Sequence, residues 1–182
     1  MRSSLFYLVK ALGDLYLLAF LLRFLLQWVR ADFYNPVTQA IVQITNPLVR
    51  PAQRFIPTSR SVDVPTLVVL VILEGILTWF LLRIGGIPAG SLAPLPVLIL
   101  FRIISLALWF YSLSILIYVI LSWIGPRGRH PVAAVLAELN EPVLRPARRL
   151  IPTIAGLDLS PLLVLILVQA AFRLLPLPSY LS

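Results

Sequence analysis

Long apolar stretches alternate with polar segments along this chain. Four of the stretches approach or exceed the roughly 20 helical residues that cross the hydrocarbon core of a bilayer. They cover approximately residues 5–29, 64–83, 97–124 and 159–175, and the last is the shortest. A segment inside lipid must satisfy its own backbone polar groups, and the alternating pattern of a membrane β-barrel is missing, so each stretch is expected to be a helix. The pattern predicts an all-α membrane protein with four transmembrane helices.

The connections between these stretches are of two kinds. Residues 85–96 are rich in Gly and Pro, which is typical of a short loop. Residues 30–63 and 125–158 are longer, and each carries apolar residues at helical spacing behind a proline suited to a first helical turn. These apolar residues are Val37, Ile41, Ile44 and Leu48 in the first linker, and Val132, Val135, Leu136, Leu139 and Val143 in the second. We therefore expect each linker to contain an amphipathic helix lying in the membrane interface.

Polar residues and prolines predict where the helices begin and bend. A residue able to cap a helix stands at four expected helix starts: Asn35, Asp63, His130 and Asp158. Inside the linker helices, Pro47 and Pro142 each remove a backbone donor. They are therefore expected to end or kink the first helix and to start a second short one.

The two halves of the chain are related by a shift of 95 residues without a gap. The pattern Pro-x-x-Arg-Pro-x-x-Arg-x-Ile-Pro occurs at residues 47–57 and again at residues 142–152. One departure is that Gln53 stands where the second copy has Arg148. Each unit contains an even number of spans, so residues 1–84 and 97–182 are expected to form parallel repeats with both linkers on one side.

Composition narrows the range of functions. Hydrophobic residues make up 60% of the chain and charged residues only 12%, whereas an average soluble domain is about 45–50% apolar and about 25% charged. Cysteine is absent and His130 is the single histidine, which leaves little for thiol chemistry, the usual zinc sites or a Ser-His-Asp triad. The formal net charge is +8, yet no nucleic-acid-binding motif accompanies it. We expect neither an enzyme nor a bound metal or cofactor.

The distribution of positive charge predicts the topology. Nearly all the loop arginines lie in the two linkers, while residues 85–96 and the tail after Arg173 contain none. Positively charged loops stay in the cytoplasm. The linkers are therefore expected to be cytoplasmic, and residues 85–96 and both termini periplasmic.

The linker arginines are the first candidate functional group. Arg50 and Arg54 lie four residues apart and share a helix face, as do Arg145 and Arg149, and Arg148 adds a further charge. One interpretation is a surface helix that anchors the topology and binds anionic phospholipid. The other is that arginines of both linkers meet and form an anion site, an ion vestibule or a docking surface.

Polar residues inside the expected spans are the second candidate group, because burial in lipid is costly for them. They are Asp14, Arg23, Glu74, Gln169 and Arg173, with Lys10 and Arg102 nearer the span ends. At about 1.5 Å per residue, Glu74 lies about 15 Å and Arg23 about 9 Å from the cytoplasmic end, so Arg23 is expected to reach toward Glu74. Three interpretations are open for this group. It can form ion pairs that fix helix packing, or a polar track for protons or cations. For Lys10, Arg102 and Arg173 the third interpretation is that the side chains snorkel to the interface.

These motifs resemble those of the YggT/YlmG family of small bacterial and plastid membrane proteins. The similar segments are Asp32-Phe33-Tyr34-Asn35-Pro36, the two proline–arginine runs, Leu121-Ser122-Trp123 and Gly156-Leu157-Asp158-Leu159-Ser160-Pro161. The two-unit form is similar to proteobacterial members, which implies the bacterial inner membrane. The resemblance implies a non-catalytic role in osmotic or ion homeostasis, or in membrane-complex assembly and cell-envelope organisation.

An ion-conducting channel or transporter component is the alternative function. Four spans leave little room for a wide pore, so a conducting form is expected to be a homo-oligomer. The expected partners are the lipid bilayer, anionic phospholipid and other membrane proteins, and not nucleic acid.

Overall fold

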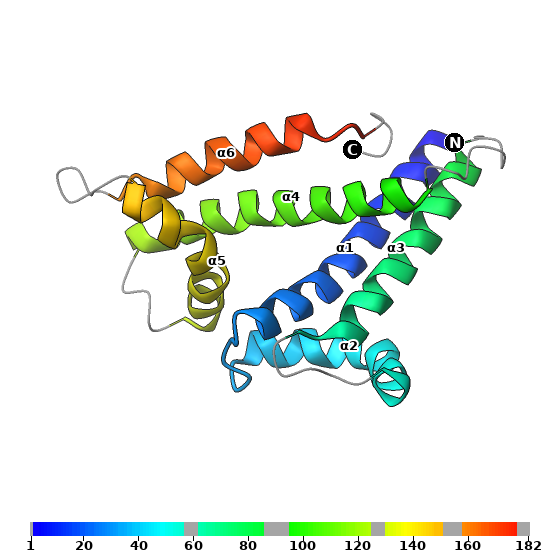
Figure 1. The fold of residues 1–182 in the computed structure, drawn as a ribbon, viewed down its shortest axis with the longest axis horizontal. Coiled ribbons are helices and arrows are strands. Elements are labelled where there is room, and N and C mark those ends of the chain that lie inside the picture. The colour runs from blue at the N-terminus through cyan, green and yellow to red at the C-terminus, as the bar shows by residue number, and fades with distance from the viewer. Residues whose placement is uncertain (1, 57–61, 86–94, 125–129, 151–157, 178–182) are drawn as a thin grey trace.

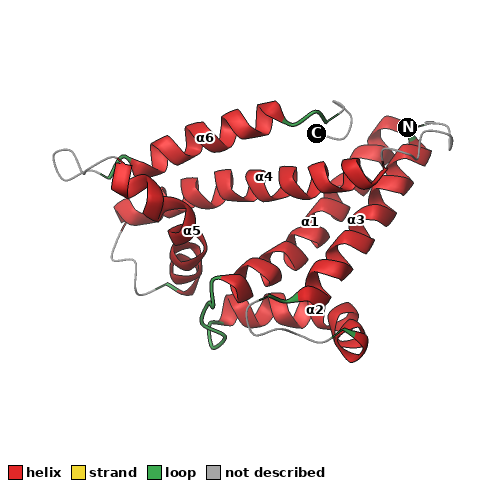
Figure 2. Ribbon diagram, viewed as in Figure 1, coloured by secondary structure: helices red, strands yellow, loops and turns green. Residues whose placement is uncertain are grey.

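The computed structural model describes residues 2–56, 62–85, 95–124, 130–150 and 158–177. Within these ranges the chain consists of helices joined by turns and loops, without strands (Figure 2). The helices are α1 (Arg2–Trp28), α2 (Pro36–Phe55), α3 (Val64–Ile84), α4 (Leu95–Ile124), α5 (Pro131–Leu150) and α6 (Ser160–Leu174). The bounds of α2 and α5 differ by 95 residues, which is the shift that relates the two halves of the sequence.

Among the described residues, three helices are long and apolar enough to cross a membrane, namely α1, α3 and α4 over Ser4–Trp28, Val64–Ile84 and Leu95–Ser122. The expected fourth span, α6, has 15 helical residues. At about 1.5 Å per residue it is about 22 Å long, less than the roughly 30 Å of a hydrocarbon core. A transmembrane position for α6 stays a prediction.

The helices form two hairpins that are inclined to one another (Figure 1). The first consists of α1 and α3 and the second of α4 and α6, which pack side by side within each hairpin. The linker helices α2 and α5 lie at the ends of their hairpins, away from the two chain termini (Figure 1). Each unit therefore has the order of long helix, linker helix and returning helix.

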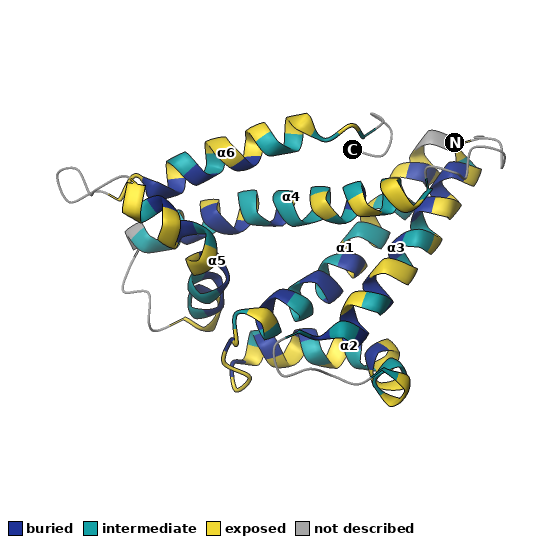
Figure 3. Cartoon of the chain, viewed as in Figure 1, coloured by how far each residue is buried: buried dark blue, intermediate teal, exposed yellow. Residues whose placement is uncertain are grey.

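Large apolar side chains occupy both the centre and the outside of the bundle. The main buried cluster includes Leu17, Phe20 and Leu26 of α1, with Leu70 of α3 and Phe110 of α4. Other large apolar residues are exposed along the outer faces of the long helices (Figure 3), among them Leu12, Ile72, Ile76, Leu116 and Ile166. Extended exposed apolar surface is unusual for a soluble monomer and suits contact with lipid.

The linker helices differ from the expectation in their continuity. Pro47 and Pro51 lie inside one helix, α2, and Pro142 and Pro146 lie inside α5. The ribbon of each changes direction along its length (Figure 1), so the prolines bend the helix and do not start a separate one. Each proline removes a single backbone donor, and the neighbouring turns keep their hydrogen bonds, which is sufficient for a kink.

The apolar stripe of α2 is also shared differently from the expectation. Ile41 is buried, together with Thr38, Thr45 and Val49, but Ile44 and Leu48 are exposed. One edge of the stripe therefore packs in the protein core, and the other edge is exposed.

All four expected caps make side-chain hydrogen bonds at helix starts. The Asn35 carboxamide accepts from the Val37 amide at 2.9 Å, and the Asp63 carboxylate accepts from the Thr66 amide at 3.2 Å. In the second unit, Nδ1 of His130 accepts from Val132 at 3.3 Å, and Asp158 accepts from Ser160 at 3.0 Å. The capping predictions are confirmed for Asn35, Asp63 and His130, whereas the N-cap position of α6 is Leu159 and Asp158 stands one residue before it.

Candidate functional sites

A cluster of charged side chains lies inside the bundle, between the two units. The guanidinium of Arg102 on α4 donates through Nε to Glu74 Oε1 of α3, and through Nη2 to Asp14 Oδ1 of α1 at 2.6 Å. Thr78 Oγ1 donates to the same Glu74 oxygen at 2.8 Å, and Lys10 Nζ lies 3.5 Å from Asp14 Oδ2. Two cations and two carboxylates from three helices thus neutralise one another at the interface between the units.

Two expectations for this group are wrong. Arg23 does not reach Glu74, and Arg102 does not snorkel, because Arg102 is only 5% exposed and fills the place beside Glu74. The geometry explains the error. Arg102 lies seven residues, or about 10 Å, from the start of α4, and Glu74 lies ten residues, or about 15 Å, from the end of α3. The end of α3 and the start of α4 lie close together, so the two side chains reach similar depths.

The other two intramembrane candidates lie apart from the cluster. Gln169 of α6 is exposed, and its Nε2 lies 3.4 Å from Ser112 Oγ of α4. Arg173 is exposed in the last turn of α6 and forms no ion pair within the described part of the chain. The structure therefore brings together Asp14 and Glu74, and not Gln169 or Arg173.

A pocket of about 380 Å³ opens beside the charged cluster. It lies between α1, α4 and α6, and polar side chains of Lys10, Asp14, Arg102 and Ser105 form part of its wall. The rest is apolar and includes Trp109 and Phe172. Within the described residues, no group of three or more His, Asp or Glu side chains could hold a metal ion.

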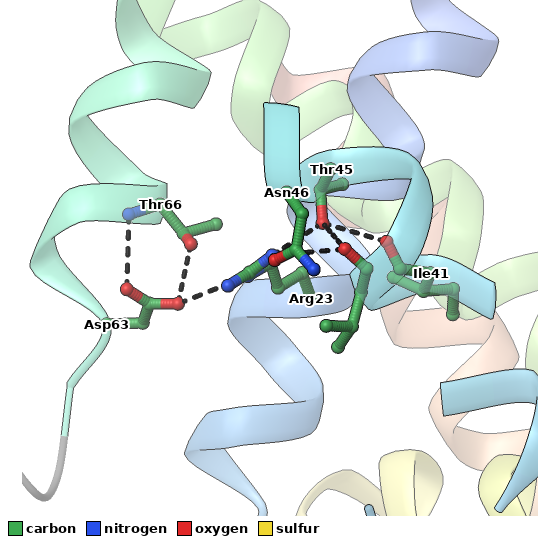
Figure 4. Close-up of polar contacts among 7 residues, drawn as sticks. Arg23, Ile41, Thr45, Asn46, Asp63 and Thr66 are labelled. Atoms are coloured by element: carbon green, nitrogen blue, oxygen red, sulfur yellow. Dashed lines mark hydrogen bonds and ion pairs between the residues drawn. The ribbon is translucent and has the colours of Figure 1, made fainter. Parts of the chain in front are cut away.

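Arg23 organises a second polar site, where α1, α2 and α3 meet (Figure 4). Its Nη1 donates to Thr45 Oγ1 at 2.8 Å and to Asn46 Oδ1 at 2.9 Å. Its Nε lies 3.5 Å from Asp63 Oδ2, the carboxylate that also caps α3 through Thr66. One cation therefore links the end of the first helix, the linker and the start of the returning helix.

The second unit builds the same junction with a different cation. The residues that correspond to Arg23, Asn46 and Asp63 at a shift of 95 are Tyr118, Glu141 and Asp158. Here Arg148 of α5 bridges all three: its Nη1 lies 2.8 Å from Glu141 Oε2, its Nε 3.0 Å from Asp158 Oδ2, and its Nη2 3.3 Å from the Tyr118 hydroxyl. Arg148 replaces Gln53, so the added linker charge compensates for the arginine that α4 lacks at this position.

Hydrogen bonds dominate the electrostatics of this second junction. Partial burial alone would lower the pKa of Arg148, but its bonds to Asp158, Glu141 and Tyr118 outweigh burial and raise that pKa above its usual value. Burial alone would raise the pKa of Asp158, but bonds from Ser160 and Arg148 hold it below its usual value. Both groups are therefore stabilised in their charged forms.

The remaining linker arginines do not meet. Arg50, Arg54, Arg145 and Arg149 are all exposed. Arg54 lies in the last turn of α2 and Arg149 in the last turn of α5, and these two helix ends point to opposite sides of the molecule (Figure 1). Each pair therefore presents its own charged surface. The sequence analysis did not identify Arg148 as a junction residue. The signal was present, because the second unit loses the arginine of position 23 at Tyr118 and gains one at Arg148 in place of Gln53.

The fold and these sites define a class of protein: an all-helical chain, compatible with a membrane, made of two similar units joined by buried ion pairs. The chain belongs to the CCB3/YggT family, which it matches over residues 2–85 and 97–178. The family resemblance seen in the sequence is thereby confirmed, and the two matched segments correspond to the two repeats.

Several bacterial proteins are similar to this chain over most of their length. The chain is 38% identical to an uncharacterised protein of Pseudomonas aeruginosa, over 89% of this chain and 83% of that protein. It is 36% identical to the protein of Escherichia coli K12 called uncharacterised protein YggT, over 91% and 86% of the two chains. A Vibrio alginolyticus protein is 38% identical over 93% and 91%. No solved structure matches this chain significantly.

Proposed function

We propose that this chain is a non-catalytic protein of the inner (plasma) membrane that acts as a scaffold in the bilayer. In this role it supports osmotic or ion homeostasis, or the assembly of membrane complexes and cell-envelope organisation. The observation that carries the proposal is the mutual neutralisation of Arg102, Glu74 and Asp14 between the two units. A path for cations needs a carboxylate that can exchange its partner for a passing ion, whereas Glu74 is 1% exposed and is held by Arg102 and Thr78. Closed pairs of this kind fit helix packing better than conduction.

The linkers supply the contact with the membrane surface. Both α2 and α5 place exposed arginines beside exposed apolar residues, such as Leu48 and Phe55 on α2 and Leu150 on α5. Such helices lie in the interface, with guanidiniums at the level of lipid phosphate. Anionic phospholipid is therefore the first partner of the proposed scaffold, with the linkers on the cytoplasmic side.

Ion flux into liposomes tests the proposal. Wild-type protein, Glu74→Gln and the matched change Glu138→Gln, which lies on α5 outside the charged cluster, are reconstituted, and proton and potassium fluxes are compared with those of protein-free liposomes. The scaffold proposal expects no added flux from any of the three. Flux that is present in wild type and in Glu138→Gln but lost in Glu74→Gln would overturn it.

That opposite result would favour the second candidate, an ion-conducting channel or transporter component acting as a homo-oligomer. One observation speaks for this candidate, namely the pocket that brings Lys10 and Asp14 to an opening beside Arg102. If no ion moves, crosslinking in intact membranes is the next step, because an assembly role requires a protein neighbour.

A further inference from the structure

A hollow of about 520 Å³ lies on α2, lined by Gln43, Asn46, Pro47, Arg50, Pro51 and Arg54. Its two arginines are exposed and form no hydrogen bond or ion pair within the described part of the chain. None of the described residues that line it is a carboxylate. The side chains around the hollow therefore offer an excess of donors and positive charge.

The partly buried neighbour Arg23 adds to this excess of donors and positive charge. Because Arg23 Nη1 donates to Asn46 Oδ1, the carboxamide of Asn46 is turned so that its oxygen faces the protein and its Nδ2 remains as a donor. Arg50 is also close enough to Arg23 for the two cations to repel one another. An anion in the hollow would relieve that repulsion and accept hydrogen bonds from Arg50 and Arg54.

The second linker repeats the proline–arginine pattern of the first but carries different charges. Gln43 and Asn46 correspond to Glu138 and Glu141, which lie on the helix face of Arg145 and Arg149. Across the positions 23, 43, 46, 50, 53, 54 and 63, the first unit has three arginines and one carboxylate. The corresponding positions of the second unit have three arginines and three carboxylates. The second linker thus carries a lower net positive charge than the first, although among the described residues Glu141 pairs with Arg148 and Glu138 accepts from the Asp32 amide.

We propose that only the first linker binds a phosphate group, in the hollow formed by Asn46, Arg50 and Arg54, and that this phosphate belongs to an anionic phospholipid headgroup. The inference rests on the proposed contact of the linkers with anionic lipid and makes that contact specific. The headgroup is the source because exposed Leu48 and Phe55 on the same helix hold the hollow at the membrane surface. The second linker then has a structural role, through Arg148.

Lipid binding to the purified full-length protein in a nonionic detergent tests this asymmetry. Native mass spectrometry measures the bound fraction during titration with phosphatidylglycerol, phosphatidylcholine or inorganic phosphate. The matched variants Arg50→Gln/Arg54→Gln and Arg145→Gln/Arg149→Gln remove the same charge from exposed positions. The first pair is expected to weaken phosphatidylglycerol binding about 10- to 30-fold, and the second pair less than about 3-fold.

A third variant, Asn46→Glu, places the second unit's carboxylate in the first. It keeps an acceptor for Arg23 and is expected to weaken phosphatidylglycerol binding at least about 5-fold. Circular dichroism and size exclusion confirm that each variant is folded.

Each other result has a defined meaning. Equal losses in both double variants overturn the asymmetry but leave the contact of the linkers with lipid intact. No loss in either variant overturns the phosphate site together with that contact. Equal binding of phosphatidylcholine, whose headgroup carries a phosphate but no net charge, overturns the preference for an anionic lipid. Inorganic phosphate bound as tightly as phosphatidylglycerol shows a free anion to be the ligand and overturns the lipid assignment. The flux experiment judges the scaffold independently.

Discussion

Replacing Arg102 by Met should be among the most destabilising single changes in the bundle. Methionine keeps an unbranched apolar stem but removes the guanidinium that pairs with Glu74 and Asp14. Glu74, 1% exposed, would retain one hydrogen bond, from Thr78. Removing one partner of a buried ion pair typically costs about 3–5 kcal/mol, and a lone charge in a membrane helix about 3 kcal/mol, so we expect a loss of about 3 kcal/mol in the free energy of unfolding.

A double-mutant cycle separates this effect from simple loss of packing. Glu74→Leu alone removes the buried carboxylate but leaves Arg102 paired with Asp14, so its cost should be smaller, about 1–2 kcal/mol. The double variant leaves no buried unpaired charge on α3 or α4, and it should be more stable than the sum of the two losses implies by about 2 kcal/mol. Unfolding by SDS in mixed micelles, followed by circular dichroism, measures all four proteins.

The reasoning is refuted if Arg102→Met lies within about 1 kcal/mol of wild type, or if the two changes are additive. Either result would mean that the carboxylates find water or become protonated at little cost. The charged cluster would then not be the contact that holds the two units together.

Three further changes test other parts of the structure. Gly13→Leu should destabilise the protein by about 1–3 kcal/mol in the same unfolding assay, because even a Cβ there would lie 2.6 Å from a side chain of α3. Because the pKa of Asp158 is lowered in the folded protein, its carboxylate stabilises the fold above the usual pKa of 3.8, and this stabilisation is lost as pH falls through the lower folded value. Asp158→Asn should abolish this part of the acid destabilisation. The effect should be no more than about 1 kcal/mol in the free energy of unfolding, because the site is exposed. Arg23→Tyr should destabilise the first junction, and adding Asn46→Glu with Gln53→Arg should restore at least half of the loss, since this combination copies the second unit.

The parts of the fold that follow from local chemistry could be predicted from the sequence. The bounds of α2 and α5 follow from a proline that starts each helix and from a capping residue, Asn35 or His130, before it. The repeat follows from a run of prolines and arginines kept at one spacing. Such signals act over a few residues, so a single sequence contains them in full.

The partners of the buried charges could not be predicted in the same way. Counting depth along separate, upright helices placed Arg23 opposite Glu74, because that count ignores how the hairpins incline to one another (Figure 1). It also ignored that α4 begins where α3 ends, which puts Arg102 beside Glu74. Similarly, nothing local to Arg148 shows that its partner is Asp158 and not lipid.

The charged cluster exists once in a chain built of two similar units. At a shift of 95 residues, Asp14, Glu74 and Arg102 correspond to Trp109, Gln169 and Tyr7, none of which is charged. A symmetric pair of units could therefore not form these ion pairs, whereas the unequal pair forms them in one arrangement only, with α4 against α1 and α3. Because an ion left unpaired in lipid is costly, other arrangements of the two units are disfavoured. The duplicated fold thus uses its differences in charge to set how its halves associate, whereas Arg50 and Arg54 of α2 take no part in this contact and stay exposed.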